Sequence, residues 1–315
     1  MSLKQFVKNK DVREKFTQEF PKPEFGIKRE LLAPPLSPLY FIVGTAFHYL
    51  MGFYVRYLNP RAAPEGWVAE VLLSDLNTFE VIKSGGKLDS WKGIKEPNLQ
   101  SYPEFLALGP KGVTDLHNKV RNIISEAKQN HSIFLQNGII TDNLIRSASL
   151  LAPLDDYYRS PRRESVYKHI GLVDEKILED LKRMIFLVDK KSFLAKKICI
   201  LSPTFGQGLL FGGGDADLII DDMLIEIKTD KELELPRDYF HQLIGYYALY
   251  KIGGIDSLPK EHDIKRFGIY FSRYGYLHVI NINDIINDKT FPSFLKWFIE
   301  KAKEKYSYIK WPTLQ

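Results

Sequence analysis

The topology of the central sheet is indicated by residues 212–230, which read GGGDADLIIDDMLIEIKTD. Two apolar runs, residues 218–220 and 223–225, stand on either side of Asp221 and Asp222. Short apolar runs separated by two turn-forming residues predict a β-hairpin, although Asp-Asp is a weaker turn pair than Asn-Gly. We therefore expect two adjacent, half-buried antiparallel strands in this segment.

The register of this hairpin brings four charged residues together. With the two central aspartates in the turn, counting outward makes Asp217 oppose Glu226 and Asp215 oppose Lys228. Successive side chains of a strand point to opposite faces, so all four charged side chains are expected on one face. The sequence thus predicts a small patch that holds three carboxylates and one ammonium group.

Two opposed carboxylates need a compensating charge. Directly opposed residues have Cβ atoms about 4.5–5.5 Å apart, and like charges at that separation destabilise the strand pair. Mg2+ prefers one or two protein carboxylates and completes its shell with water and substrate phosphate. Lys228 would then orient or deprotonate a water molecule while the metal stabilises the charge that develops on the phosphate. The pattern favours phosphodiester hydrolysis; the alternative is a set of exposed charges on a surface hairpin.

The segment before the hairpin is dense in glycine. Five of the 21 glycines lie within nine residues: Gly206, Gly208, Gly212, Gly213 and Gly214. Glycine permits a close approach between the backbone and a ligand, or a strongly bent entry into a strand. A plain flexible loop explains the same composition equally well.

Motifs on both sides of the turn resemble those of a known nuclease family. Asp217 followed by Glu226-Ile227-Lys228 is similar to the Asp…(Asp/Glu)-x-Lys signature of the PD-(D/E)XK nuclease superfamily. Further along, Gln242 and Tyr246 match the Gln-x-x-x-Tyr motif of its RecB-type, lambda-exonuclease-like branch. Residues four apart lie on one face of a helix, one turn from each other. An ordinary core-facing helix with a tyrosine stripe would show the same spacing.

An upstream motif, Gly44 to His48, resembles the Gly-x-x-x-His motif that this branch carries on an early helix, and the three motifs occur in the family's order. The resemblance covers about residues 40–58 and 200–282. It implies an α/β fold with a restriction-endonuclease-like core, a mixed central sheet flanked by helices, that cuts DNA with Mg2+ or Mn2+. A single histidine on an apolar helix is otherwise more often a hydrogen-bonded core residue.

The resemblance also implies roles for individual residues. Asp217, Glu226 and His48 would bind the metal, Lys228 would be the catalytic lysine, and the Gln-x-x-x-Tyr pair would line the site. The proline of the family's name is absent, and a glycine precedes Asp215 instead. Either Asp215 or Asp217 is therefore the first metal ligand. We favour Asp217 because it immediately precedes the apolar strand.

Two groups of polar and basic residues are candidate DNA contacts. The first follows the predicted catalytic strand and would meet phosphate or form a solvated loop: Thr229, Lys231, Arg237 and His241. The second is a basic and aromatic cluster suited to phosphate contacts and base stacking, or to an exposed loop: Tyr157, Tyr158, Arg159, Arg162 and Arg163.

Composition is compatible with this interpretation without requiring it. The chain has 315 residues with 44% hydrophobic content, enough for a sizeable core. Its net charge of +5 would help binding to a polyanion but is small for this length. Cys199 is the single cysteine, which excludes an intramolecular disulfide and a four-cysteine iron-sulfur cluster.

The sequence contains one segment long enough to test for a membrane helix. Residues 32–55 lack Asp, Glu, Lys and Arg. They include three prolines as well as His48, so a buried helix that starts near Pro38 fits better than a membrane span. The N-terminal residues lack the apolar core of a signal peptide, and a cytoplasmic protein without a membrane partner is expected.

Periodicity predicts the remaining elements. Apolar positions with helical spacing lie in residues 113–135, 141–151 and 172–190, the last with Asp174 as a cap. Residues 265–282 indicate two strands joined by a glycine turn. A last helix is predicted from Thr290 to Tyr306.

We interpret the chain as one nuclease domain, residues 1–315. Residues 1–190 would be a mainly helical region that contributes the first core helix near 39–58. Residues 191–285 would hold the catalytic sheet and the Gln-x-x-x-Tyr helix, and residues 286–315 the C-terminal helix.

The expected function is hydrolysis of DNA phosphodiesters with one or two Mg2+ ions, in DNA repair or recombination, with exonuclease favoured over endonuclease action. One alternative is a non-catalytic DNA-binding or assembly subunit that retains the nuclease fold. Another is a metal-dependent phosphohydrolase that acts on nucleotides or RNA. No Gly-x-x-x-x-Gly-Lys-(Ser/Thr) loop occurs, so a helicase motor would be a partner, as would a recombination protein. The oligomeric state stays open.

Overall fold

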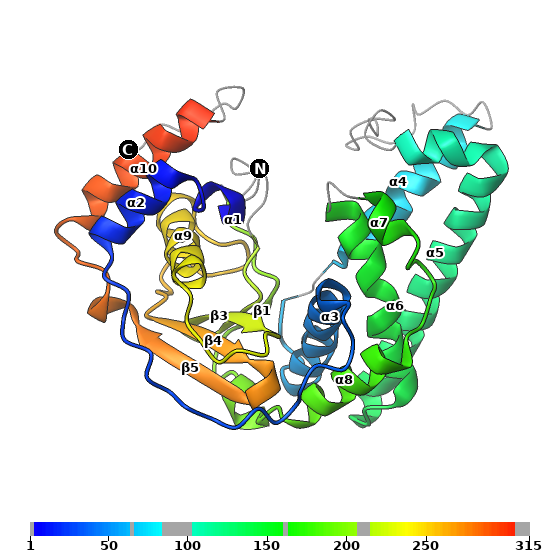
Figure 1. The fold of residues 1–315 in the computed structure, drawn as a ribbon, viewed down its shortest axis with the longest axis horizontal. Helices are drawn as coiled ribbons and strands as arrows, with labels where there is room; N and C mark the ends of the chain where they lie inside the picture. Colours follow the sequence, from blue (N-terminus) through cyan, green and yellow to red (C-terminus); the bar gives the residue numbers. More distant parts are fainter. Residues whose placement is uncertain (1–2, 64–65, 84–102, 160–162, 207–214, 306–315) are drawn as a thin grey trace. The chain divides into compact units, whose positions relative to one another are not determined.

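The computed structural model describes residues 3–63, 66–83, 103–159, 163–206 and 215–305. The chain forms two compact units (Figure 1). The first unit comprises Met1–Leu32, Leu58–Glu65 and Leu187–Gln315. The second unit comprises Ala33–Tyr57 and Gly66–Phe186. The interpretation as a single domain stays a prediction.

The first unit contains a sheet that is, within the described residues, five-stranded, in the order β1-β2-β3-β4-β5. Its strands are β1 (Cys199–Leu201), β2 (Leu218–Ile220), β3 (Met223–Lys228), β4 (Arg266–Phe271) and β5 (Tyr276–Asn281). The neighbouring pairs are antiparallel except β3 and β4, which are parallel. A parallel pair needs a long crossover connection. Here that connection contains helix α9 (Arg237–Gly253).

The predicted hairpin is confirmed, with its register. Leu218 pairs with Ile225 and Ile220 pairs with Met223, which leaves Asp221 and Asp222 as the turn. Asp221 has a φ of 52°, a left-handed conformation that is uncommon for a non-glycine residue. Its carboxylate accepts hydrogen bonds from three consecutive backbone amides, those of Lys196, Lys197 and Ile198. These bonds offset the turn strain and explain how a weak turn pair is tolerated.

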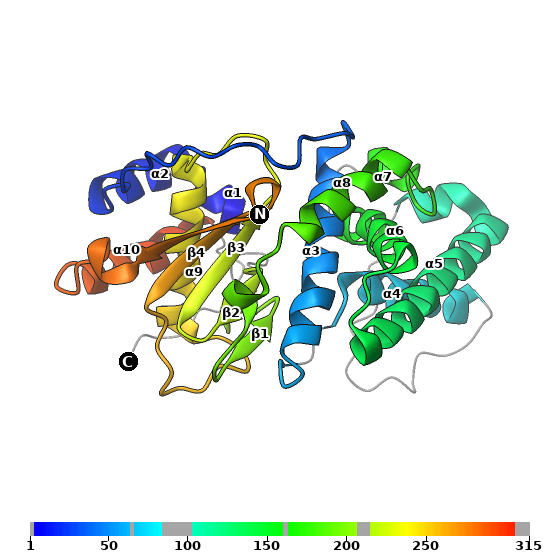
Figure 2. The same cartoon turned by 90° about the horizontal axis from the view of Figure 1, so that it is seen from below.

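Four helices cover one face of the sheet: α1 (Leu3–Phe6), α2 (Lys10–Glu19), α9 and α10 (Phe291–Lys305). Within the first unit, α9 lies between the sheet and the pair formed by α2 and α10 (Figures 1 and 2). The core between these layers includes Leu224 of β3 and Ile269 of β4. Because side chains alternate along β3, Glu226 and Lys228 lie on the same face as Leu224, beneath α9.

The two predicted C-terminal strands and their glycine turn are confirmed as β4 and β5. A short 3-10 helix, η5 (Ser272–Tyr274), joins them and ends at Gly275, which has a φ of 55°. A Cβ atom at Gly275 would lie 2.8 Å from the carbonyl oxygen of Leu187. Both the backbone conformation and the lack of space therefore favour glycine here.

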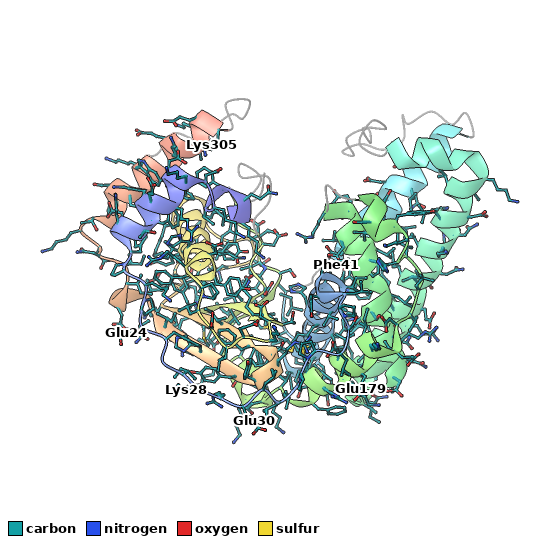
Figure 3. All side chains as sticks on the ribbon, in the orientation of Figure 1. Glu24, Lys28, Glu30, Phe41, Glu179 and Lys305 are labelled. Carbon is teal, nitrogen blue, oxygen red and sulfur yellow. The ribbon has the colours of Figure 1, made fainter. Side chains whose placement is uncertain are left out.

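The segment between α2 and residue 32 passes beside the strand end at β4 and β5. The rings of Phe25 and Phe271 have centroids 5.7 Å apart. Three charged side chains of the same segment are exposed and project away from the sheet (Figure 3): Glu24, Lys28 and Glu30. The segment thus covers apolar side chains and presents charges to solvent.

The second unit is helical throughout its described part. Its helices are α3 (Tyr40–Leu58, to Tyr57 in this unit), α4 (Val68–Lys83), α5 (Pro103–Asn137), α6 (Asp142–Arg159), α7 (Arg163–Tyr167) and α8 (Glu175–Phe186). A 3-10 helix, η3 (Lys190–Phe193), follows in the first unit. Helix α6 packs against α4, α5, α7 and α8.

The helical predictions for the N-terminal half are confirmed. The Asp174 carboxylate accepts a hydrogen bond from the backbone amide of Lys176 (2.8 Å), as expected of a cap. The first core helix predicted near 39–58 is α3. Among the described residues, no helix is long and apolar enough to span a bilayer.

Candidate active site

The hairpin brings Asp217 next to Glu226. Asp217 immediately precedes β2, and its Oδ2 accepts a hydrogen bond from the backbone amide of Ile227 (2.5 Å). Its carboxylate therefore reaches strand β3 at the residue after Glu226. By strand alternation Asp217 continues the face of Ile219, which belongs to the core beneath α9. Strand alternation puts the two carboxylates on one face, although the β2–β3 ladder ends at Leu218 and does not itself include Asp217.

Glu226 is the centre of a buried polar network. It is 6% exposed, and its Oε1 accepts hydrogen bonds from Lys228 Nζ and from Gln242 Nε2, both at 2.8 Å. Its Oε2 is buried and has no hydrogen-bond partner within the described residues. An unpaired buried carboxylate oxygen is costly, so this atom is a natural ligand for a cation.

The electrostatics of Glu226 support the same conclusion. Burial raises the pKa of Glu226, and the charge of Asp217 raises it further, whereas Lys228 and Lys4 lower it. The buried carboxyl group therefore favours a neutralising proton or cation. A cation between the two carboxylates would remove their mutual repulsion and favour the ionised form of both.

Helix α9 supplies the two residues of the Gln-x-x-x-Tyr motif. Gln242 donates from Nε2 to the Tyr246 hydroxyl (2.7 Å), which confirms that the two residues share one helix face. Tyr246 in turn donates to the carbonyl oxygen of Asp215 (2.8 Å). Burial and the charges of Glu226 and Asp217 raise the pKa of Tyr246, so its hydroxyl stays protonated. The motif helix is thus tied to both strands of the hairpin region.

Tyr239 is a site residue that the sequence argument missed. The Nζ of Lys228 lies 4.3 Å from the centroid of the Tyr239 ring, a cation-π geometry. The Tyr239 hydroxyl donates to Asp230 (2.5 Å). Tyr239 precedes Gln242 by three residues and Tyr246 by seven, which is one helical stripe. That spacing was the available signal.

The turn after β4 fixes the end of β3 through three consecutive residues. Ser272 Oγ donates to the carbonyl oxygen of Lys228 (3.0 Å), and Arg273 Nε donates to that of Thr229 (2.7 Å). Tyr274 donates from its hydroxyl to the carbonyl of Lys231. We call these three bonds the η5 clamp. The clamp holds the backbone that carries Lys228. No local sequence pattern predicts it.

Asp215 and His48 are the two remaining predicted metal ligands. Asp215 pairs with Thr204 in an isolated antiparallel bridge, and the β2–β3 ladder ends at Leu218. The expected opposition of Asp215 to Lys228 is therefore not part of the ladder. His48 lies half-buried on α3 in the second unit, whereas the carboxylates belong to the first unit. Its role as a ligand stays a prediction.

The residues after β3 that were predicted to contact DNA differ in their exposure to solvent. Arg237 is the first residue of α9 and is partly exposed, as is Thr229. His241 is 0% exposed and packs on Phe16, with ring centroids 5.3 Å apart. The expectation that His241 meets phosphate is therefore wrong, because the side chain points into the core.

The basic cluster of the second unit is described only in part. Arg159 is the last residue of α6 and forms an ion pair with Asp155 (2.7 Å). Arg163 is the first residue of α7. Arg162 lies outside the described residues, as do Gly208, Gly212, Gly213 and Gly214. Gly206 is described, and a Cβ atom there would lie 2.4 Å from the Gly253 carbonyl oxygen.

The donor set suits a hard divalent cation. Among the described residues, no group of three or more His, Cys, Asp and Glu side chains is arranged to hold a metal. Two carboxylates completed by water and phosphate are nevertheless the usual complement for Mg2+. The alternative of an exposed, solvated hairpin face is wrong, since Glu226 and Lys228 are both buried. Comparisons with protein-family models, curated proteins and solved structures found no match for this chain.

Proposed function

We propose that the protein is a metal-dependent DNA nuclease. The observation that carries the proposal is the state of Glu226. One carboxylate oxygen is held by Lys228 and Gln242, while the other is buried and has no hydrogen-bond partner within the described residues. The charge of Asp217 also raises the pKa of this carboxyl group. A structural ion pair would not need this additional acidic neighbour. A metal site for phosphodiester hydrolysis would.

Asp217 and Glu226 are the proposed ligands of Mg2+ or Mn2+. When bound, the metal would supply positive charge to the phosphate and lower the pKa of a coordinated water molecule. Lys228 is held by Glu226, Gln242 and the ring of Tyr239. Its fixed ammonium group would orient the attacking water. Gln242 would hold the carboxylate of Glu226 in its ligating orientation, as outer partners of metal ligands commonly do.

The arrangement of the sheet supports the proposed restriction-endonuclease-like core. The acidic hairpin, the crossover helix α9 and the parallel strand β4 follow one another in the chain. Strands β3 and β4 pair side by side, and α9 packs on them in one hydrophobic core. Each motif of the suspected family in the first unit lies on one of these elements.

The first experiment identifies the substrate and the mode of cleavage. Linear, circular and single-stranded DNA are incubated with the protein, with Mg2+ or Mn2+ and with EDTA. We expect linear DNA to shorten while circular DNA survives, the pattern of an exonuclease. DNA binding that is insensitive to EDTA, without nicking in Mn2+, would favour a non-catalytic subunit instead.

The second experiment assigns the activity to the site. Glu226→Gln and Lys228→Met keep approximate side-chain size, and each should lower cleavage by about a hundredfold or more. Asp222→Asn is the matched control because Asp222 lies in the same hairpin and pairs with Arg266 instead. Thermal unfolding establishes that each variant is folded. Cleavage retained by both folded variants would exclude this site.

A further inference from the structure

The short helix α1 is fixed against the helix that carries the Gln-x-x-x-Tyr motif. Leu3 and Phe6 are 1% and 0% exposed, and the Phe6 ring packs edge-on against Phe298 of α10 with centroids 5.4 Å apart. Two buried residues three apart hold a single helical turn in one orientation. The backbone position of Lys4, one of the two residues between them, is therefore set by core packing.

The anchor point on α9 is Gly245, inside the motif. A Cβ atom at Gly245 would lie 3.2 Å from both Cδ atoms of Leu3, closer than most such contacts. Glycine at this position therefore allows α1 to approach the turn of α9 between Gln242 and Tyr246. The same turn of α9 that contacts the acidic hairpin also receives α1.

Lys4 differs from Lys228 in its accessibility. Lys228 is 7% exposed and donates hydrogen bonds to Glu226 and Gln242. Lys4 is exposed to solvent, and no hydrogen bond or ion pair engages its ammonium group within the described residues. Because the Lys228 ammonium is already hydrogen-bonded, it stabilises the site. The exposed ammonium of Lys4 can instead bind an incoming anion.

Lys4 nevertheless senses the charges of the site. Although the residue is exposed, its pKa is lowered by the nearby charge of Lys228 and by partial desolvation from the surrounding protein, whereas Glu226 and Asp217 raise it. Conversely, Lys4 is among the groups that lower the pKa of Glu226. The placement of Lys4 itself follows from packing, because the preceding residue, Leu3, contacts Gly245 in the turn of α9 between Gln242 and Tyr246. Lys4 therefore lies beside the helix turn that contacts the acidic hairpin.

We infer that Lys4 binds a backbone phosphate of the DNA strand beside the bond that is cut. The inference rests on the proposed nuclease function and names a substrate contact for it. Each DNA phosphate carries one negative charge, and a lysine ammonium binds it as a point charge. Lys4 would hold the strand in place, while Asp217, Glu226 and Lys228 act at the scissile phosphate.

The test compares Lys4→Gln with Lys4→Arg, which keeps the charge. Lys10→Gln removes an exposed lysine from the neighbouring helix α2 and serves as the matched control. Steady-state cleavage is measured in Mn2+. Binding to the same DNA is measured in Ca2+ over a range of salt concentrations, and Glu226→Gln is included as the variant that should lose cleavage.

For Lys4→Gln we expect KM to rise about tenfold with a smaller change in kcat. The slope of log Kd against log salt should fall by about 0.7–0.9, the loss of one phosphate contact. Lys4→Arg should restore both quantities, and Lys10→Gln should leave them unchanged.

An unchanged KM and salt slope in Lys4→Gln would overturn this inference while leaving the nuclease proposal intact. So would a loss of kcat alone with an unchanged salt slope. Absence of metal-dependent cleavage in the wild-type protein would instead overturn the proposed function itself.

Discussion

Gln242 donates a hydrogen bond from Nε2 to Glu226 Oε1 at 2.8 Å and thereby joins helix α9 to strand β3 at the centre of the candidate site. The same nitrogen donates to Tyr246, and the amide oxygen accepts from Lys228 at 3.3 Å. Both amide hydrogens and the amide oxygen are thus used. A fully satisfied buried amide fixes the orientation of its partners.

Replacement of Gln242 by alanine should weaken both the fold and the activity. Glu226 and Tyr246 each lose a buried hydrogen-bond partner, which should lower the free energy of unfolding by about 1–3 kcal/mol. Cleavage should fall by about tenfold or more because Glu226 is no longer held in place. Urea unfolding and Mn2+-dependent cleavage measure the two effects. An unchanged cleavage rate in the folded variant would show that the amide plays no part in orientation.

Substitutions at Tyr239 separate its ring from its hydroxyl. Tyr239→Phe keeps the aromatic face over Lys228 and loses only the bond to Asp230, so cleavage should stay within about threefold of wild type. Tyr239→Leu removes the cation-π contact and should lower cleavage by about tenfold. Rates are compared at saturating DNA. Equal losses in both variants would assign the effect to the hydroxyl.

Gly275 should not tolerate alanine. It has a φ of 55° and a ψ of 34°, the left-handed region, so alanine should strain the backbone by about 1 kcal/mol. A Cβ atom would also lie 2.8 Å from the Leu187 carbonyl oxygen. Gly26→Ala is the control because its backbone is not left-handed and a Cβ atom there meets nothing within 4 Å. Gly275→Ala should therefore be the more destabilising in thermal or urea unfolding, and equal stability of the two variants would contradict this.

Stability should depend on pH through His241. Burial lowers the pKa of His241 from 6.5 to about 4, so the folded protein holds the neutral ring where the unfolded chain takes up a proton. Stability is therefore complete above pH 6.5 and is lost as pH falls towards 4, by at most about 3 kcal/mol.

The measurement compares wild type with His241→Leu, which cannot take up a proton. The difference in unfolding free energy between pH 7.5 and pH 4.5 should be smaller in the variant. An identical pH dependence in the two proteins would remove His241 as the cause.

In the second unit, Asp156 should produce the opposite dependence. Burial raises the pKa of Asp156 from 3.8 to about 7, even though Thr45 donates a hydrogen bond to its Oδ1 (2.8 Å). The ionised form is penalised in the folded state, so stability decreases as pH rises from 3.8 through about 7.

Asp156→Asn retains an acceptor for Thr45 and removes the ionisation. The variant should be more stable than wild type at pH 8, by at most about 4 kcal/mol, and nearly equal to it at pH 4. Unfolding curves at the two pH values test this. Destabilisation at pH 8 would show that the charge of Asp156 is compensated in the folded protein.

Local pattern was sufficient for much of the fold. The two apolar runs around Asp221 and Asp222 specified the hairpin, and the alternation of β3 then placed Glu226 and Lys228 on one face, since a strand has a side-chain period of two. The spacing of apolar residues likewise specified α5, α6 and α8, since a helix has a side-chain period of 3.6. The pairing of Gln242 with Tyr246 followed from one turn of helix.

Local sequence pattern could not predict contacts between residues distant in the chain. The η5 clamp joins Ser272 to the carbonyl of Lys228, 44 positions away, and Leu3 packs against Gly245 on a different helix. Neither pair is linked by a strand or helix period. The burial of His241 is similar, because its position four residues before Gly245 fits a solvent-facing or a core-facing side chain equally well until α2 covers it.

What the amino-acid order fixed, then, is the set of charged groups on the hairpin and the elements that carry them, because hydrophobic periodicity and strand alternation act over a few residues. Packing between elements decided how those groups are buried and which atom of Glu226 has no hydrogen-bond partner. It also brought the exposed Lys4 of α1 to the helix that carries Gln242 and Tyr246. Burial and electrostatic environment are properties of the assembled layers, since each depends on atoms contributed by α1, α9 and the turn after β4 together.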